Sequence, residues 1–433
     1  MNEMAEGTGR RAAVSRREPC AAMLFLCQVF HPDYQATSQV FSDLMFELAR
    51  RGQSVHVVSG WPLASPEALA VGVPKVERLG RLEIQRAGFR INFKQNLFLR
   101  GLGYLSYLGG SMSRLLLCKR GSLIMGCTNP PMMPVVVWFA SCLRQQHYVL
   151  FLLDVYPDGL VALGKIKRGG LVDRLWTALN RRAFQKAQRI LVLGRDMARL
   201  VERRYGCLPE TIRYIPHWSQ NETPAPARPE ETRLWSRLGF NGNFVVQYSG
   251  NMGLWHDMHS LVRAAYCLRE HKRIKFLFIG DGRRKREAQA LATELGATNI
   301  TWLPYQPKES LNDSLACCHV ALISQREGLQ GVAVPCKLYG ILASGRAVIG
   351  LVPCSSEVAL VIEEEKCGLV LRPDDDQGLA AAILALLEKP EDVREMGQRA
   401  RRAYQQKYTL EHGVERFTEA ISGLEDEAGG AQN

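Results

Sequence analysis

The chain has 433 residues, 46% of them hydrophobic, which is enough to bury the cores of two domains. Its net charge of +12 is unevenly spread, because residues 1–220 hold 30 Lys and Arg against 15 Asp and Glu while residues 221–433 hold 25 against 28. The basic half suits an anionic surface, but aromatic residues are not interleaved with its basic clusters, which argues against nucleic acid as a partner. The twelve cysteines form no Cys-x-x-Cys pair, as expected of reduced cytosolic thiols rather than of a metal site.

Residues 1–19 are polar and arginine-rich without an apolar segment, so they predict a disordered basic lead-in and no secretory signal. An apolar strand over residues 22–29, a polar loop at 35–39, an amphipathic helix and a second strand at 54–59 then predict a βαβ unit. Ligands of such units bind at the carboxyl ends of the strands, so Thr37 and Ser38 are expected in the loop on the ligand side.

Two later segments of the first half each have two interpretations. Residues 97–118 mix Leu, Phe and Tyr with Arg100 and Arg114, which is typical either of a membrane-interface segment or of a buried helix weakened by its glycines. The strand at 148–153 ends in Asp154-Val155-Tyr156-Pro157-Asp158. A carboxylate there either holds or deprotonates a hydroxyl in a cleft, or caps the next turn. No apolar run is long enough to span a bilayer.

A proline-rich stretch at 223–229 predicts a linker before a second α/β unit. In that unit apolar strands end in the turns Gly250-Asn251-Met252-Gly253 and Gly280-Asp281-Gly282, where glycine lets the backbone approach a phosphate. Pro335 opens a helix that Gly345 ends, with Lys337 in its first turn. A cation beside the positive end of a helix indicates an anionic ligand, and a solvated lysine is the alternative.

Three of these motifs carry a resemblance: Gly250-Asn251-Met252-Gly253, Pro335-Cys336-Lys337-Leu338-Tyr339-Gly340 and Ser356-Glu357-Val358-Ala359. In this order they resemble the donor half of family 4 retaining glycosyltransferases of the GT-B fold, and most closely the exopolysaccharide and O-antigen branch of the colanic-acid type. The similarity extends over residues 23–424. It implies an α/β fold of two Rossmann-like, doubly wound domains that face each other across a cleft.

The resemblance and the linker divide the chain into six parts. These are a lead-in at 1–19, an acceptor-binding domain at 20–220, a linker with the helix after it at 221–242, a nucleotide-sugar-binding domain at 243–409, a helix at 410–424 that crosses back to the first domain, and a tail at 425–433.

The resemblance also assigns roles to individual residues. Donor binding falls to Gly250, Asn251, Gly253, His256, Lys337 and Glu357, catalysis to Asp154 and Glu327, and the acceptor-side loop to Thr37, Ser38 and Asp158. Asn251 and His256 stand where other family members carry cations for the diphosphate, so Lys337 and backbone N–H groups are expected to meet more of that charge. Gly340 replaces the usual second glutamate of the donor site, and Glu357 is expected to bind the ribose hydroxyls instead.

The implied activity is transfer of a sugar, with retention of configuration, from a nucleotide-sugar such as a UDP-sugar to a lipid-linked or saccharide acceptor in cell-surface polysaccharide biosynthesis. The enzyme is expected to be cytoplasmic and peripheral, at the inner face of the cell membrane, with an anionic membrane surface as a partner. No metal or other cofactor is expected, because helix termini and cations stabilise the departing nucleoside diphosphate. Two alternatives stay open: a nucleotide-sugar 2-epimerase on the same fold, and a noncatalytic partner subunit, which Gly340 would suit.

Overall fold

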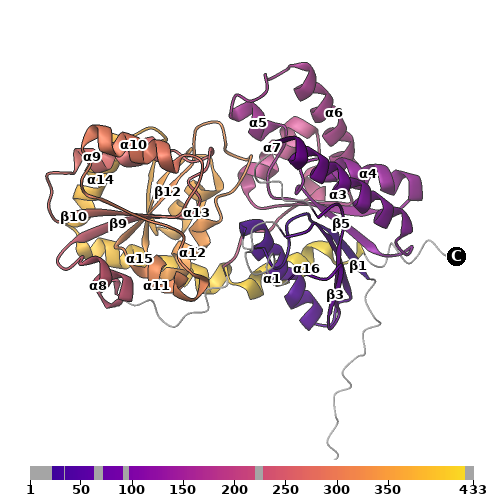
Figure 1. Ribbon diagram of the computed structural model, residues 1–433, viewed down its shortest axis with the longest axis horizontal. Helices are drawn as coiled ribbons and strands as arrows, with labels where there is room; N and C mark the ends of the chain where they lie inside the picture. Colours follow the sequence, from indigo (N-terminus) through magenta and orange to yellow (C-terminus); the bar gives the residue numbers. More distant parts are fainter. Residues whose placement is uncertain (1–21, 34, 63–71, 91–96, 220–227, 425–433) are drawn as a thin grey trace, which may run out of the picture.

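The computed structural model describes residues 22–33, 35–62, 72–90, 97–219 and 228–424. It contains two α/β units, each built on one sheet, as Figure 1 shows. The sequence prediction of an α/β chain with two Rossmann-like sheets is therefore confirmed. The predicted lead-in at 1–19 and tail at 425–433 lie outside the described residues, as does most of the linker.

The N-terminal sheet has eight strands in the order β3-β4-β2-β1-β5-β6-β7-β8. Its strands are β1 (Met23–Leu26), β2 (Val55–Ser59), β3 (Val76–Leu79), β4 (Leu82–Arg86), β5 (Leu123–Cys127), β6 (Tyr148–Leu152), β7 (Arg189–Val192) and β8 (Ile212–Tyr214). All pairs are parallel except β3 with β4. The central strands β1, β5 and β6 are buried along their whole length and read as continuous apolar runs, because helices cover both faces of a parallel sheet.

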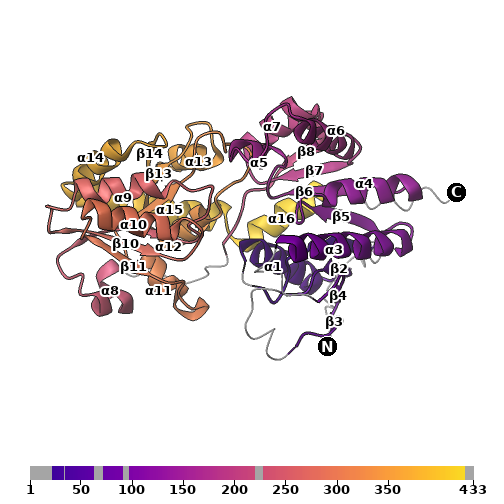
Figure 2. The same cartoon turned by 45° about the horizontal axis from the view of Figure 1, so that its top comes forward.

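The helices of this unit form two groups that can be followed in Figures 1 and 2. They are α1 (Ala36–Arg50), α3 (Leu97–Leu117), α4 (Met133–Arg144), α5 (Asp158–Ala162), α6 (Leu171–Gln185), α7 (Arg195–Tyr205) and the 3-10 turn η1 (Pro209–Thr211). In one group α1 packs against the C-terminal helix α16 (Leu410–Ile421), and in the other α3, α4, α6 and α7 follow one another. The chain moves outward from β1 in opposite directions through the two groups, so right-handed crossovers place them on opposite faces.

One prediction for the first helices was wrong, and a second segment took one of its two predicted forms. The polar residues 35–39 do not form a loop, because α1 begins at Ala36 and takes Thr37 and Ser38 into its first turn. The segment from Leu97 to Leu117 is one continuous helix of 21 residues despite its glycines. Packing explains one of them: a Cβ on Gly110 would lie 3.0 Å from the Cβ of Ala87, so glycine lets the helix lie close to the end of β4.

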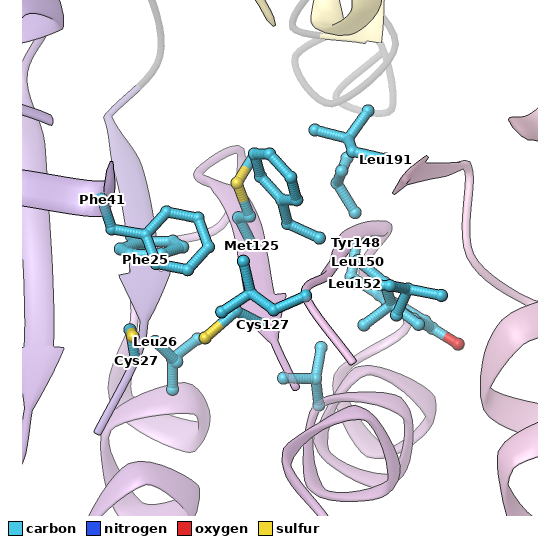
Figure 3. Packing of buried hydrophobic residues seen from close by; sticks show 14 of the residues in the cluster. Phe25, Leu26, Cys27, Phe41, Met125, Cys127, Tyr148, Leu150, Leu152 and Leu191 are labelled. Atoms are coloured by element: carbon cyan, nitrogen blue, oxygen red, sulfur yellow. The ribbon is translucent and has the colours of Figure 1, made fainter. Parts of the chain in front are cut away.

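The core of the N-terminal unit is completed by the far end of the chain. Phe25 on β1 packs on Phe41 of α1, with ring centroids 4.8 Å apart, and Figure 3 shows both beside Met125 of β5. Phe417 of α16 stacks on Phe151 of β6 at 6.4 Å and belongs to the same buried cluster. The helix after residue 409 therefore packs on the first unit and not on the second.

The C-terminal sheet has six parallel strands in the order β11-β10-β9-β12-β13-β14. They are β9 (Phe244–Ser249), β10 (Ile274–Ile279), β11 (Ile300–Leu303), β12 (Val320–Ser324), β13 (Ala347–Leu351) and β14 (Gly368–Leu371). The surrounding helices are η2 (Pro229–Glu231), α8 (Arg233–Leu238), α9 (Met258–Cys267), α10 (Lys285–Leu295), η3 (Lys308–Ser310), α11 (Leu311–Ala316), α12 (Lys337–Ser344), α13 (Glu357–Glu365), α14 (Asp376–Leu387) and α15 (Pro390–Lys407).

The two sheets meet through the loops at the carboxyl ends of their strands. Asp154, just after β6, forms an isolated antiparallel bridge with Ala333, and the next amide, of Val155, donates to the Val332 carbonyl at 2.8 Å. Val334 is buried in the core cluster of the N-terminal unit. Because ligands of open α/β sheets bind at the carboxyl ends, this junction is the place to look for the functional site.

Candidate active site

The two glycine turns predicted to bind the donor are pressed against each other. Gly280 has φ +131°, and a Cβ there would lie 2.0 Å from the Gly250 carbonyl oxygen. A Cβ on Gly282 would lie 2.4 Å from the Met252 carbonyl oxygen, and the Met252 amide donates to the Asp281 carbonyl at 2.8 Å. The backbone of the first turn is therefore held by the second, which is the preorganised surface that a close backbone approach to a ligand requires.

Lys337 lies directly beside this surface, and its role in donor binding stays a prediction. Its ammonium donates to the Tyr248 hydroxyl at 2.6 Å and sits 3.8 Å from the centre of the Tyr248 ring, while a Cβ on Gly250 would lie 3.5 Å from Lys337 Nζ. Tyr248 in turn donates to the Asn251 carbonyl at 2.7 Å. Burial lowers the pKa of Lys337 to about 7. An anion bound here would restore its charge, so the pocket is electrostatically prepared for a phosphate.

His256 lies in the same region but without charge. Its Nδ1 pairs with the Ser324 carbonyl at 2.9 Å, and since a carbonyl only accepts, Nδ1 carries the proton. Burial and then the neighbouring Lys337 lower the pKa of His256 to about 3. The ring is neutral at physiological pH, so His256 adds no positive charge for a diphosphate. The cations at the glycine turns are Lys337 and Lys285, whose ammonium donates to the Gly280 carbonyl at 2.7 Å.

Asp154 faces the donor side from the N-terminal unit. Its amide donates to Thr128 Oγ1 at 3.2 Å, and its half-buried carboxyl group has a pKa that burial raises to about 7. Burial first, and the Asp154 carboxylate in addition, raise the pKa of the Cys336 thiol, so the carboxylate lies near the start of α12. A carboxyl group that titrates near neutral pH beside the donor turn has the properties of a general base.

Glu357 occupies a position that the sequence did not indicate. Its side chain is 1% exposed, and its two oxygens accept hydrogen bonds from the N-terminal unit: the Arg195 amide at 2.7 Å, the Arg195 guanidinium at 3.0 Å and the Tyr214 hydroxyl at 2.6 Å. This geometry is at odds with the predicted ribose contact, because the carboxylate is already saturated. In this arrangement Glu357 joins the two units, and a ribose would have to displace one of these donors.

Asp158 does not belong to an acceptor loop, and that prediction was wrong. It opens the short helix α5 and is buried, with its carboxylate paired to the Arg204 guanidinium at 2.7 Å and accepting from the Tyr205 hydroxyl at 2.6 Å. Both partners lie on α7 of the same unit. The motif after β6 therefore supplies one carboxylate to the cleft and uses the other to hold α5 on α7.

The remaining predicted residues lie around the junction without forming a cluster. Thr37 is partly exposed and Ser38 is buried, both at the start of α1, while Glu327 is exposed in the turn after β12. A Cβ on Gly340 would have Leu315 of α11 as its nearest neighbour, at 3.6 Å. The roles of Thr37, Ser38 and Glu327 stay predictions.

Sequence reasoning missed the turn from β7 into α7, where Gly194 and the first helical residues, Arg195 and Asp196, hold the second unit. The Gly331 amide donates to the Asp196 carboxylate at 2.7 Å, and a Cβ on Gly194 would lie 2.8 Å from Val334. A signal was present, because Val192-Leu193-Gly194 ends a strand with a glycine as the donor turns do. Its partners are more than 130 residues away along the chain, so only the fold reveals them.

Two general findings complete the description of the site. Among the described residues, there is no group of three or more His, Cys, Asp and Glu side chains that would hold a metal ion. No helix in the described part of the chain is both long enough and apolar enough to cross a membrane.

Known proteins match both units. The family described as glycosyl transferase 4-like domain matches residues 36–218, and the family described as glycosyl transferases group 1 matches residues 243–389. A probable glycosyltransferase, WbjE, of Pseudomonas aeruginosa is 26% identical over 370 residues, 85% of this chain and 90% of WbjE. A putative colanic acid biosynthesis glycosyl transferase, WcaI, of Escherichia coli is 26% identical over 248 residues, 56% of this chain and 60% of WcaI. The solved structure of Anabaena HepE with UDP and glucose has a TM-score of 0.69 at 17% identity, covering 94% of this chain and all of HepE.

Two Rossmann-like sheets with a site between their carboxyl edges define the class of GT-B glycosyltransferases, and the structural likeness agrees with this fold. The chain belongs to family 4 of these enzymes, as the resemblance in its donor motifs implied.

Proposed function

We propose that this glycosyltransferase moves a sugar, with retention of configuration, from a UDP-sugar to a lipid-linked or saccharide acceptor during cell-surface polysaccharide synthesis. The observation that carries the proposal is that the loop before α12 pairs with Asp154 at Ala333, while Lys337 in the first turn of α12 contacts Tyr248 and Gly250 at the donor turn. The names of WbjE and WcaI support a polysaccharide product, and the HepE complex supports UDP as the nucleotide.

In this proposal, residues of the C-terminal unit stabilise the leaving group and Asp154 of the N-terminal unit positions the acceptor. The backbone of Gly250 to Gly253 and the Lys337 ammonium meet the charge that develops on the departing diphosphate. The Asp154 carboxylate holds the acceptor hydroxyl and accepts its hydrogen bond, and phosphate oxygens of the donor help to take its proton. No metal is required by this arrangement, because backbone dipoles and Lys337 meet the phosphate charge.

We place the enzyme in the cytoplasm at the inner face of the cell membrane, where a lipid-linked acceptor would be reached. The basic N-terminal half supports this location, because anionic headgroups attract clustered Lys and Arg.

The test is transfer by the purified full-length chain. A panel of UDP-, GDP- and dTDP-sugars is first ranked by thermal shift, and the best donor is incubated with lipid-linked and free saccharide acceptors in saturating EDTA. We expect UDP-sugars to give the largest shift and the anomeric configuration of the donor to be kept in the product. Absolute dependence on added Mg²⁺ or Mn²⁺, or an inverted product, would overturn the mechanism, and conversion of the donor to its epimer without an acceptor would replace it with the 2-epimerase reaction.

A further inference from the structure

Large apolar side chains that are exposed to solvent gather on three neighbouring helices of the N-terminal unit. Of fourteen such residues in the described chain, nine lie on α3, α4 and α6, which pack side by side, and the C-terminal unit has one, Tyr305. The nine are Leu102, Leu105, Leu116 and Leu117 on α3, Phe139 and Leu143 on α4, and Leu171, Val172 and Leu175 on α6. We call this surface the α3–α4–α6 face, and Figure 2 shows α3, α4 and α6 one above another in the first unit.

The same surface is basic and has no exposed acid. Residues 101–186 contain eleven Lys and Arg, ten of them exposed, and three acidic residues, none of them exposed. Asp158 and Asp173 are buried in ion pairs with Arg204, and Asp154 is half-buried at the junction. Every charge that this stretch presents fully to solvent is therefore positive, with Lys119 and Arg120 after α3 and Lys165, Lys167 and Arg168 before α6.

The exposed leucines lie on the outward side of α3. Leu102, Leu105 and Leu116 point to solvent, while Tyr107 and Leu115 face the core, and the Tyr107 hydroxyl donates to the Val58 carbonyl at 2.8 Å. The sequence suggested Tyr104 and Tyr107 as residues of a membrane-interface segment. Burial excludes Tyr107, so the face must use leucines from the opposite side of the helix. The exposed fractions are large, 67% for Leu105 and 76% for Leu117.

We propose that the α3–α4–α6 face is the docking surface of this enzyme on an anionic lipid bilayer. Leucine and phenylalanine side chains enter the headgroup region, and the surrounding lysines and arginines bind lipid phosphates. The inference deepens the membrane location proposed above and rests on it. The basic loop before α6 belongs to this surface and follows α5, which begins shortly after Asp154.

The combination of the two features favours a bilayer over other anionic partners. A polyanion in solution would be bound by the basic residues alone and would leave nine apolar side chains in water. A protein partner would bury the apolar residues inside a polar rim, which does not require every exposed charge of the rim to be positive. Exposed charges that are all positive, in the same segment as exposed apolar residues, match a surface that is negative everywhere and apolar a few ångströms below.

The experiment is flotation of the full-length protein with vesicles of phosphatidylglycerol and phosphatidylcholine, compared with pure phosphatidylcholine. A charge variant carries Lys119→Glu, Arg120→Glu and Lys167→Glu, and its matched control reverses the exposed Lys272, Arg273 and Lys389 of the C-terminal unit. An apolar variant carries Leu105→Ser, Leu117→Ser and Leu143→Ser, and its control changes the exposed Val76, Leu79 and Leu208 to Ser.

We expect the wild type and both controls to float with the anionic vesicles. The charge variant should lose roughly 100-fold in partitioning, because each basic residue contributes several-fold. The apolar variant should bind at low salt but be released completely by high salt, whereas the wild type is released only in part. Equal loss in a variant and its matched control, or no flotation by the wild type, would overturn the docking face.

The wild type and its variants also distinguish a failure of the docking face from a failure of the proposed function. Thermal shift by UDP is measured on each variant, and it should equal that of the wild type because none of the changed residues lies at the donor turns. If the wild type floats but shows no shift with any nucleotide-sugar, the proposed donor fails while the docking face stands. If UDP binds and the wild type does not float, the docking face fails alone.

Discussion

The two sides of the cleft differ in the groups that they present: one side presents mainly backbone groups and the other presents side chains. On the donor side, Gly250, Gly280 and Gly282 bring backbone groups together at distances that exclude any side chain. Lys337, at the start of α12, lies beside Gly250, and burial lowers its pKa to about 7. On the side of the N-terminal unit, the groups at the junction are side chains, Asp154 and Arg195, whose positions depend on strands β6 and β7. A backbone site leaves glycines at fixed spacing in the sequence, whereas a side-chain site leaves only common residue types. Substitutions on the two sides should therefore fail in different ways.

Asp154→Asn should have the largest effect on the reaction. The change keeps the shape but removes the base, so transfer should fall by about 100- to 10,000-fold. Because burial raises the pKa of Asp154 to about 7, the wild-type rate should rise as the pH passes upward through 7, and this limb should disappear in the variant. The raised pKa also means that the folded protein favours the protonated Asp154. The contribution of this group to folding stability is fully present below its unfolded pKa and is lost as the pH rises through about 7. The variant should consequently be no less stable than the wild type at pH 8, which thermal unfolding measures.

Gly280→Ala should damage the donor side through the backbone. The added Cβ would clash with the Gly250 carbonyl at φ +131°, and we expect a loss of about 3 kcal/mol in stability together with weak UDP binding. The control is Gly296→Ala, whose φ is +74° with nothing within 4 Å of the added Cβ. That variant should lose about 1 kcal/mol and keep UDP binding. Equal losses in the two variants would show that the contact between the turns is not essential.

Lys337→Ala should weaken UDP binding or transition-state stabilisation by roughly 1.5–3 kcal/mol with little change in stability. Proton uptake on UDP binding distinguishes a Lys337 that pairs with the diphosphate charge from one that only shapes the pocket. Since the pKa of free Lys337 is about 7 and a bound diphosphate raises it, UDP binding at pH 8 should take up a proton. Isothermal titration in buffers of different ionisation enthalpy measures this uptake, which should vanish in the variant. Unchanged uptake would remove Lys337 from the diphosphate site.

Tyr214→Phe should have the smallest effect, and it concerns the link between the two sides. The hydroxyl donates at 2.6 Å to the buried Glu357, so its loss should cost about 1.5 kcal/mol of stability while Arg195 still holds the carboxylate. Tyr266→Phe on α9 is a control far from this contact and should change little. If Glu357 instead binds the ribose during the reaction, Tyr214→Phe should strengthen donor binding by releasing the carboxylate, and kinetics with the UDP-sugar would reveal it.

The sequence determined the class of fold and the donor half of the site. Continuous apolar strands at 148–153 and 244–249 predict parallel sheets buried on both faces, and glycine turns after such strands mark where a phosphate approaches the backbone. These features are local: strand, turn and helix start are adjacent in the chain, so their spacing is legible. Lys337 was found for the same reason, since its place in the first turn of α12 follows from Pro335.

Tertiary structure alone decided what each carboxylate does. Asp154, Asp158 and Glu357 each follow a strand, yet one faces the cleft, one is buried against Arg204 and one joins the two units through Arg195. Their roles depend on which partners the folded sheets bring near, and those partners are separated by up to 162 residues. On α3, Tyr107 is buried and Leu105 is exposed. A helix with apolar residues on all sides does not show in its sequence which side will be buried, so the packing of the helix on the sheet decides it.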